Sequence, residues 1–600
     1  MTSWWRLLRH VSLLVARVDA RAALVAAVLL VGQSGVVAAT GLSQRWLVDS
    51  AATRWVTGIA AAVVLGAVAH GMWGAVGRVQ SNITLYLNGR VQLALNEEVQ
   101  RRIAAVPTLA HVESAAHLDR LNRLRMTTGS LAGLPWSVLG AASTVLGLLI
   151  SIWLLASVSP WLCLLAALAL PILLANRLAD RVLRETRDAC SELIRRERRL
   201  HELCTQPGSA KEIILAGTGQ ELRRRSRELW EQAAAREAGA QLRAAALQVA
   251  GWTLFGCGLA AAIFVTTQLT RTDRASLGDV VLVVTLATQL QIQLRTVLDS
   301  VSTVAEAGQA VSHYWWLREY ESSERHGGTE PPAVLRDGIR FEQVSFRYPD
   351  ADQDTLTGID LRLPAGSTVA VVGSNGAGKS TLVKLLTGMY TPTRGRITVD
   401  GQPLSAIDLT AWQSRLTGVF QDFARLQLRL RESIGAGDVT RIRDRVAVEA
   451  AVARADADAV VDRMPNGLET SLGAAFGGVE PSVGQWQKIA LARSLMAETT
   501  RTGDERTGTL CVVLDEPSSA LDPVAEHEMF RQVVGQVWQA KRRGAVALLV
   551  SHRFSTVRMA DVVVVLDQGR VTEVGSHDQL MAADGGYAEL YRLQAGAYRP

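Results

Sequence analysis

Six long, nearly charge-free apolar segments limit the folds open to this 600-residue chain more than any other feature. A helix needs about 20 largely apolar residues to cross the hydrocarbon core of a bilayer. A buried core helix could explain any single run, but not six runs flanked by arginine. A signal peptide is the competing interpretation of the first run, which exceeds the usual apolar length of about 7–15 residues. We therefore predict six spans, near residues 22–42, 56–77, 134–156, 161–175, 247–267 and 277–298.

The charges between the runs predict how the chain is oriented. The loops at 78–133 and 177–246 are long and rich in arginine, whereas the alternate loops are short and carry few charges. Positive loops remain on the cytoplasmic side, so the N-terminus and both long loops are predicted to be cytoplasmic. This asymmetry accounts for the net charge of +6, and nucleic acid is not an expected partner.

The two long loops have a helical texture, with turn residues near their midpoints. Pro107 and the Pro207–Gly208 pair mark these turns. We predict that each loop is an out-and-back pair of helices, with short tip helices near 111–124 and 209–218. These tips would lie farthest from the membrane.

A few polar residues interrupt the predicted spans. Gln289 and Gln293 are four residues apart on one helix face. They either line a substrate cavity or form hydrogen bonds between helices, and the sequence favours neither. Arg295 is expected to reach the cytoplasmic interface, and His70 to be a packed or interhelical residue. The five cysteines have no CxxC or metal-ligand spacing, so we expect no disulfide framework.

A charged, proline-containing stretch divides the chain. We predict a membrane domain over residues 1–320, a linker over 321–336 and an α/β domain over 337–600. An apolar strand at 367–373 ends in a glycine-rich loop and a helix, which matches the pattern G-x-x-x-x-G-K-[ST] in its required context. Such a loop wraps phosphates with backbone N–H groups, while its lysine reaches the β/γ-phosphates and its serine hydroxyl binds Mg²⁺. The loop consists of Gly373, Ser374, Asn375, Gly376, Ala377, Gly378, Lys379, Ser380 and Thr381.

Two further strands end in polar residues. The strand at 510–514 leads into Asp515 and Glu516, and the strand at 548–551 leads into His552. The carboxyl ends of parallel strands meet at one edge of a sheet, beside the phosphate loop. Asp515 is therefore a candidate Mg²⁺ ligand and Glu516 a candidate for polarising the attacking water. His552 is a candidate sensor of the γ-phosphate.

With these motifs in this order, the chain resembles an ATP-binding cassette (ABC) exporter with six spans fused to one nucleotide-binding domain. The resemblance implies that Tyr348 stacks on adenine and that Gln421 links Mg²⁺ to the membrane domain. It also implies that 519–522 form the D-loop, that His552 is the switch histidine and that the loop tips are coupling helices. The expected fold is an all-α transmembrane domain plus an α/β P-loop domain.

The signature motif departs from the family pattern Leu-Ser-Gly-Gly-Gln. This chain has Pro481, Ser482, Val483, Gly484 and Gln485. In the family this segment caps the γ-phosphate of ATP on the opposite subunit, so Ser482, Gly484 and Gln485 are candidate nucleotide contacts. A β-branched residue cannot take a positive φ cheaply, so Val483 either impairs the site or points away from it.

The resemblance implies an ATPase that exports an amphipathic substrate, such as a peptide, hydrophobic natural product, drug or lipid, with ATP and Mg²⁺ as cofactors. It would act as a homodimer or heterodimer in the bacterial plasma membrane, in contact with lipid and with its nucleotide-binding domain in the cytoplasm. The cassette also resembles those of bacterial exporters associated with modified peptides. One alternative is an ATP-binding partner subunit with an impaired signature site in a heterodimer. Another is an importer built on the exporter fold.

Overall fold

The computed structural model describes residues 2–168, 170–272, 274–324, 328–501, 508–516, 544–551 and 554–597. The chain forms two compact units. The membrane unit comprises Met1–Val99 and Arg123–Trp315, and the cassette unit comprises Gln100–Asn122 and Trp316–Pro600.

Two features of this division differ from the predicted boundaries. The tip of the first long loop belongs to the cassette unit, because its residues pack against the α/β domain. The last long helix continues to Glu324, four residues into the segment predicted to be a linker. Neither difference is visible in the hydropathy pattern, because both segments are polar and helical.

Long helices build the membrane unit. The first helix is broken at Asp19 (φ −162°, ψ 94°), where its Oδ1 accepts a hydrogen bond from the N–H of Ala22 at 2.9 Å. This bond caps a new helix that contains the first span. The helices are α1 (Thr2–Ala52), α2 (Val56–Ala104), α4 (Ala115–Val158), α5 (Leu164–Leu168), α6 (Leu170–Thr205), α7 (Pro207–Ala216), α8 (Gly219–Arg271) and α9 (Leu277–Glu324), with a 3₁₀ turn η1 at Pro160–Cys163. The short tip helix α3 (Ala110–Glu113), between α2 and α4, belongs to the cassette unit.

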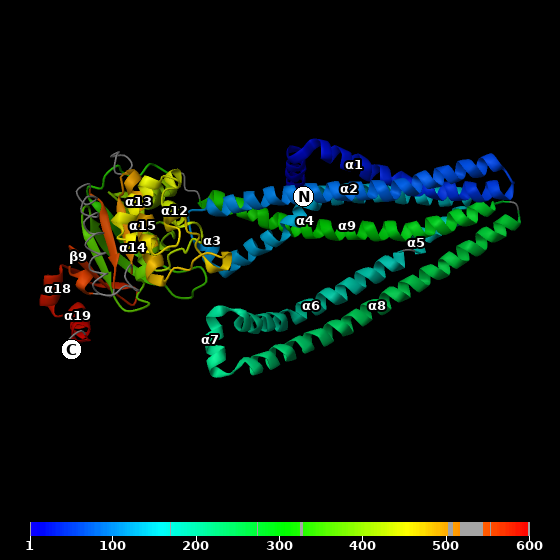
Figure 1. Ribbon diagram of the computed structural model, residues 1–600. Helices are drawn as coiled ribbons and strands as arrows, with labels where there is room; N and C mark the ends of the chain where they lie inside the picture. Colours follow the sequence, from blue (N-terminus) through cyan, green and yellow to red (C-terminus); the bar gives the residue numbers. More distant parts are fainter. Residues whose placement is uncertain are drawn as a thin grey trace. The chain divides into compact units, whose positions relative to one another are not determined.

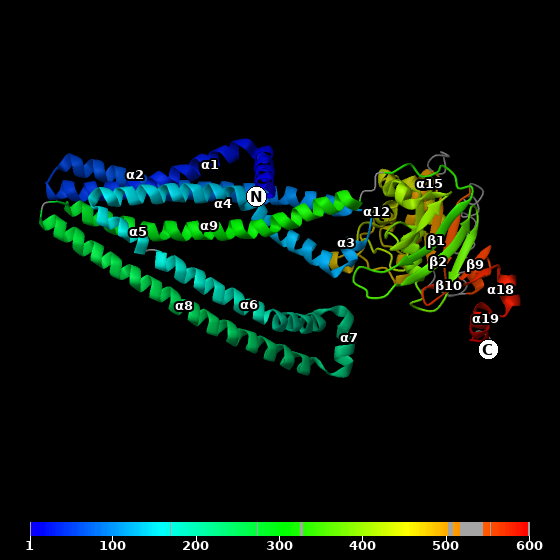
Figure 2. The same cartoon turned by 180° about the vertical axis from the view of Figure 1, so that it is seen from behind.

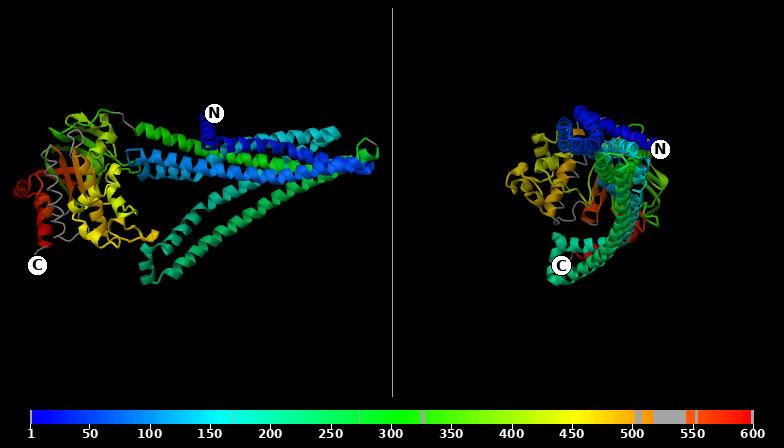
Figure 3. Two further views of the ribbon diagram at one scale, coloured as in Figure 1. Left: turned by 45° about the horizontal axis from the view of Figure 1, so that its top comes forward. Right: turned by 90° about the vertical axis from the view of Figure 1, so that its right-hand side faces the viewer.

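Among the described residues, six helical stretches are long and apolar enough to cross a membrane, which confirms the predicted all-α membrane domain. Within the membrane unit, α6 and α8 run side by side and are joined by α7 (Figures 1 and 2). This hairpin diverges from the bundle that contains α1, α2, α4 and α9, as the further views also show (Figure 3). The tip helix α7 begins at Pro207, which fixes a helical φ at the first turn.

The polar residues of the predicted spans differ in burial and in hydrogen bonding. Gln293 is buried at 7% exposure, and its Oε1 lies 3.4 Å from the hydroxyl of Ser151, which donates from α4. This contact favours an interhelical role for Gln293. Gln289 is half-buried and its Oε1 has no hydrogen-bond partner within the described residues, whereas His70 and Arg295 are exposed.

Two β-sheets form the core of the cassette unit. The first is antiparallel, in the order β2-β1-β4-β5, and the second has the order β10-β9-β3-β8-β7-β6. The strands are β1 (Gly338–Phe346), β2 (Leu356–Pro364), β3 (Thr368–Val372), β4 (Arg394–Val399), β5 (Gln402–Pro403), β6 (Leu416–Val419), β7 (Cys511–Asp515), β8 (Val546–Val550), β9 (Val562–Asp567) and β10 (Arg570–Gly575). Strands β9, β3, β8, β7 and β6 are parallel, so their carboxyl ends share one edge.

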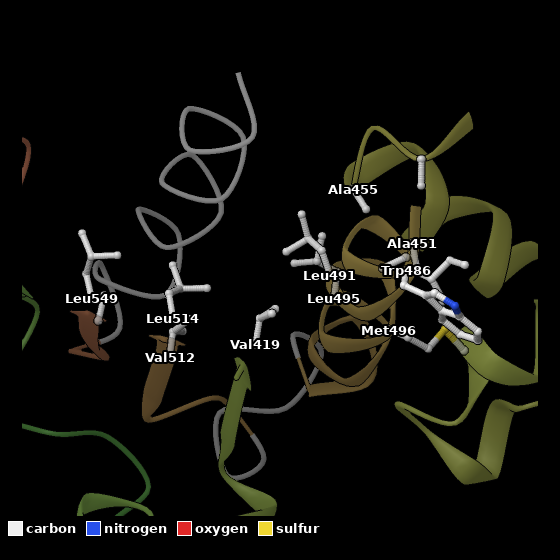
Figure 4. Close-up of a cluster of buried hydrophobic side chains, with 14 of the residues drawn as sticks. Val419, Ala451, Ala455, Trp486, Leu491, Leu495, Met496, Val512, Leu514 and Leu549 are labelled. Carbon is white, nitrogen blue, oxygen red and sulfur yellow. The ribbon is translucent and has the colours of Figure 1, made fainter. Parts of the chain in front are cut away.

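Helices cover this parallel sheet. They are α10 (Lys379–Leu386), α11 (Leu409–Ser414), α12 (Leu430–Gly435), α13 (Arg445–Arg454), α14 (Asp458–Asp462), α15 (Val483–Arg501), α17 (Phe554–Val557), α18 (His577–Ala583) and α19 (Gly586–Ala597). Every residue of β3, β7 and β8 is buried, as expected for parallel strands covered on both faces. Figure 4 shows part of the core, where strand residues such as Val419 and Leu514 share a cluster with Trp486 and Leu491 of α15.

Candidate nucleotide-binding site

The predicted phosphate loop connects β3 to α10 at the shared sheet edge. Three of its glycines have positive φ, at 156° for Gly373, 81° for Gly376 and 100° for Gly378. A Cβ on Gly373 would lie 2.1 Å from the carbonyl oxygen of Leu566, so no larger residue fits there. The loop therefore depends on glycine both for its conformation and for space. Ser374, Asn375 and Ser380 are exposed, whereas Ala377 and Thr381 are buried.

Lys379 bends back over this loop. Its Nζ donates to the carbonyl oxygens of Gly373 at 3.0 Å and Ser374 at 2.9 Å. Burial lowers the pKa of Lys379, while the nearby Glu516 and Asp515 oppose that shift. The structure thus brings the lysine, the loop and both acidic residues together.

The strand register explains how the acidic residues reach the loop. Asp515 pairs with Val550 of β8, and Val550 in turn pairs with Val371 of β3. Glu516 follows directly, and its N–H donates to the carbonyl oxygen of Val550 at 2.9 Å. Its φ of 47° lies in the left-handed region, which is strained for a side chain other than glycine. Such strain is typical of functional sites.

Asp515 is the most perturbed acid of the site. It is 5% exposed, and among the described residues no donor lies within hydrogen-bond distance of its Oδ1. Burial raises its pKa to about 6, against a hydrogen bond from Ser380 that lowers it. A buried carboxylate oxygen with no donor is costly unless a cation approaches it. The Asp515 carboxylate accepts the hydrogen bond from Ser380, the residue that the motif assigns to a metal.

The residues assigned by family resemblance lie around the same edge. Tyr348 is half-buried in the loop after β1, and its hydroxyl lies 3.0 Å from Oγ1 of Thr381 in the phosphate loop. Gln421 is exposed and follows β6 by two residues. The neighbouring Asp422 contributes to the raised pKa of Asp515, so this segment lies near the candidate metal ligand.

The signature segment forms the N-terminus of α15. The N–H of Ser482 donates to Oε1 of Gln485 at 2.8 Å, and the N–H of Gln485 donates to the hydroxyl of Ser482 at 3.3 Å. This reciprocal pair is a capping box. Val483 is the first residue of the helix and is absent from the positive-φ residues, so the expected backbone strain does not arise. Its side chain is 51% exposed.

Two predicted elements lie outside the described residues, namely His552 and the segment 519–522. The residue contacts between the first loop tip and the α/β domain could not be predicted from the sequence. The N–H of Leu109 donates to the carbonyl oxygen of Met389 at 3.0 Å, and Nε2 of Gln413 donates to that of Pro107 at 2.8 Å. These partners are hundreds of positions apart, so no local pattern could indicate them.

Comparisons with known proteins agree with this geometry. Residues 356–502 match the family model described as ABC transporter. The ATP-dependent lipid A-core flippase of Chromohalobacter salexigens is 34% identical over 317 residues, which are 53% of this chain and 51% of the flippase. The subtilin transport ATP-binding protein SpaT of Bacillus subtilis is 29% identical over 320 residues, 53% of this chain and 50% of that protein. These alignments span about half the length of the curated relatives.

A solved structure covers more of the chain. It is described as a bacterial Atm1-family ABC exporter with ATP bound, and it matches with a TM-score of 0.75 at 23% identity over 96% of this chain and 98% of its own. The fold is thus a six-helix membrane domain fused to an α/β nucleotide-binding domain. The chain is thus similar to ABC transporters over residues 356–502, and over most of its length it shares the fold of the solved exporter structure.

Proposed function

We propose that the chain is one half of a dimeric exporter that couples ATP hydrolysis to the efflux of an amphipathic substrate. The observation that carries this proposal is that Lys379, Asp515 and Glu516 lie close together at the phosphate loop. The same chain has six apolar helical stretches among its described residues. Glu516 would orient the water that attacks the γ-phosphate. Lys379 and the loop N–H groups would stabilise the charge that develops on the phosphate oxygens.

The residues present fit a bound Mg²⁺. The carboxylate of Asp515, whose Oδ1 has no partner in the described part of the chain, and the adjacent hydroxyl of Ser380 are hard oxygen ligands of the kind that this ion prefers. Gln421 would complete the set from the end of β6. Bound there, Mg²⁺ would supply positive charge for the phosphates, while the chain's own residues position the water and the nucleotide.

A second chain is needed in this proposal because the signature segment would close on ATP held by the partner. The capped N-terminus of α15 offers N–H groups and a positive helix dipole to a phosphate. Closure and reopening of the two cassettes would drive alternating access in the membrane domains. Two relatives are named for lipid A-core and for subtilin, which keeps lipids and peptides among the candidate cargoes.

ATP hydrolysis by the full chain in lipid nanodiscs tests the proposal. The Lys379→Ala variant should lose at least about 100-fold in steady-state rate, because the charge opposite the phosphates is lost. Lys488→Ala is the matched control, since Lys488 pairs with Asp456 at 2.9 Å elsewhere in the cassette. Equal rates for the two variants would overturn the assignment.

A second candidate is a subunit whose signature site is impaired and whose active partner is another protein. Val483, which replaces a glycine of the family motif and is exposed at the start of α15, favours this candidate. A purified chain that binds ATP but does not hydrolyse it would support the heterodimer. Hydrolysis that Lys379→Ala abolishes would support the homodimer.

A further inference from the structure

Lys384 lies where three functional parts of the cassette unit meet. It is on α10, five residues after Lys379, and its Nζ bonds both carboxylate oxygens of Glu113, at 2.8 and 3.1 Å. Glu113 is the last residue of the tip helix α3. The same ammonium lies 5.4 Å from the centre of the Tyr348 ring. One side chain therefore contacts both the tip helix and the aromatic residue proposed to bind adenine.

Neighbouring groups hold this ammonium in place. Tyr390 donates its hydroxyl to the same carboxylate of Glu113 at 2.6 Å, and its ring lies edge-on to Tyr348 with centres 5.3 Å apart. Burial lowers the pKa of Lys384, but its bond to Glu113 and the nearby Tyr348 outweigh burial, so that pKa lies above the ordinary value. The lysine thus stays charged across the physiological range, and the contact persists.

A second link joins the same two segments independently. Asp350 lies two residues after Tyr348, and its carboxylate accepts the N–H of Ala115 at 3.0 Å and faces the hydroxyl of Ser114 at 3.4 Å. Ser114 directly follows α3. The loop that carries Tyr348 is therefore tied to the tip through its backbone neighbour as well as through Lys384.

We propose that Lys384 is a positioning residue that makes the tip segment 105–118 respond to the base of the nucleotide, and not only to its phosphates. The inference rests on the proposed function, because it requires adenine to stack on Tyr348. A base against this ring restrains Tyr348, and the Lys384–Glu113 pair passes the restraint to α3. A ligand with phosphates and no base would fill the loop without restraining the ring.

Hydrogen exchange of the full chain in nanodiscs tests the proposal with ATP and inorganic triphosphate. A Glu516→Gln background limits turnover, and each ligand is added until amides 373–381 are equally protected. ATP should then slow exchange in 105–118 about fivefold more than triphosphate does, the scale expected when one ion-pair link is engaged. Lys384→Met should reduce the difference between the two ligands to the part that the Asp350 link carries, and Lys384→Arg should restore the full difference.

The outcomes separate this inference from the proposed function. Lys488→Met is the control, because its ion pair has a similar lysine exposure of 23% against 27% for Lys384. It should keep the full difference between the ligands. The inference would be overturned if ATP and triphosphate protected 105–118 equally in the protein that retains Lys384. It would also be overturned if Lys384→Met kept the full difference between the two ligands. Absence of any ATP protection at 373–381 would instead contradict the proposed nucleotide site.

Discussion

The membrane unit and the cassette unit use the same apolar residue types but place them oppositely. In the most apolar window of α1, 11% of the residues are buried, whereas all five residues of β7 are buried. The α-helix satisfies its own backbone, so its apolar side chains can face lipid. A strand cannot, and it must pair with neighbours under a cover of helices. Burial alone therefore does not show whether an apolar side chain lies in a favourable environment. What decides this is whether its exposed surface faces lipid or water.

Two tryptophans give the strongest test of this comparison. Trp412 in α11 is fully buried and its Nε1 donates to the carbonyl oxygen of Leu386 at 3.0 Å, whereas Trp153 in α4 is 69% exposed. Trp412→Ala should destabilise the cassette unit by about 3–5 kcal/mol, because it leaves a cavity and an unpaired carbonyl. Thermal unfolding followed by exchange of the β3 amides measures the loss. Trp153→Ala should leave that transition unchanged, and equal shifts would break the comparison.

The next largest expected effect compares two exposed leucines, one in the membrane unit and one in the cassette unit. Leu149 in α4 is 58% exposed, and Leu428 in the cassette unit is 45% exposed. Leu149→Arg should cost about 3 kcal/mol of membrane insertion, because a charge then faces hydrocarbon. Leu428→Arg should change stability by no more than about 0.5 kcal/mol, because it faces water. Protease protection of the spans in membrane vesicles measures insertion; normal insertion of Leu149→Arg would show that this face of α4 meets water.

The same contrast separates what the sequence could and could not predict. The spans and the phosphate loop could be predicted because each is a contiguous segment of the chain. Hydropathy indicates the spans, and the spacing of glycines indicates the phosphate loop. The bond between Glu113 and Lys384 joins residues 271 positions apart, and no local pattern indicates it. The family motif alone suggests a strained backbone at Val483, but the capping box of Ser482 and Gln485 starts the helix there in an ordinary helical conformation.

The next prediction concerns a buried polar group of the cassette unit, the carboxylate of Asp515. The pKa of Asp515 is raised to about 6, above the value of about 4 expected in an unfolded chain. The folded state therefore binds more protons between about pH 4 and 6, so stability falls as the pH rises through that window. Asp515→Asn should remove this dependence and add about 2 kcal/mol at pH 7 without Mg²⁺.

Urea unfolding at pH 5 and pH 7, with and without Mg²⁺, checks this expectation. Mg²⁺ should stabilise the unsubstituted chain at pH 7, because the ion favours the ionised carboxylate, and should have little effect on Asp515→Asn. Asp456→Asn, which changes an exposed carboxylate, is the control. A pH dependence that survives in Asp515→Asn would mean that another group titrates.

The smallest expected effect concerns an apolar side chain that is exposed in the cassette unit, where most apolar side chains of the sheet are buried. Val483 is 51% exposed at the start of α15, where water or a partner subunit, and not lipid, would surround it. Because its backbone is helical and unstrained, Val483→Gly should change steady-state ATP hydrolysis by less than about threefold, the cost of a glycine in a helix being at most about 1 kcal/mol. The measurement is the nanodisc assay with the unsubstituted chain beside it. A rise of tenfold or more would mean that the valine side chain obstructs the partner's phosphate, and the impaired heterodimer subunit would then be the better description.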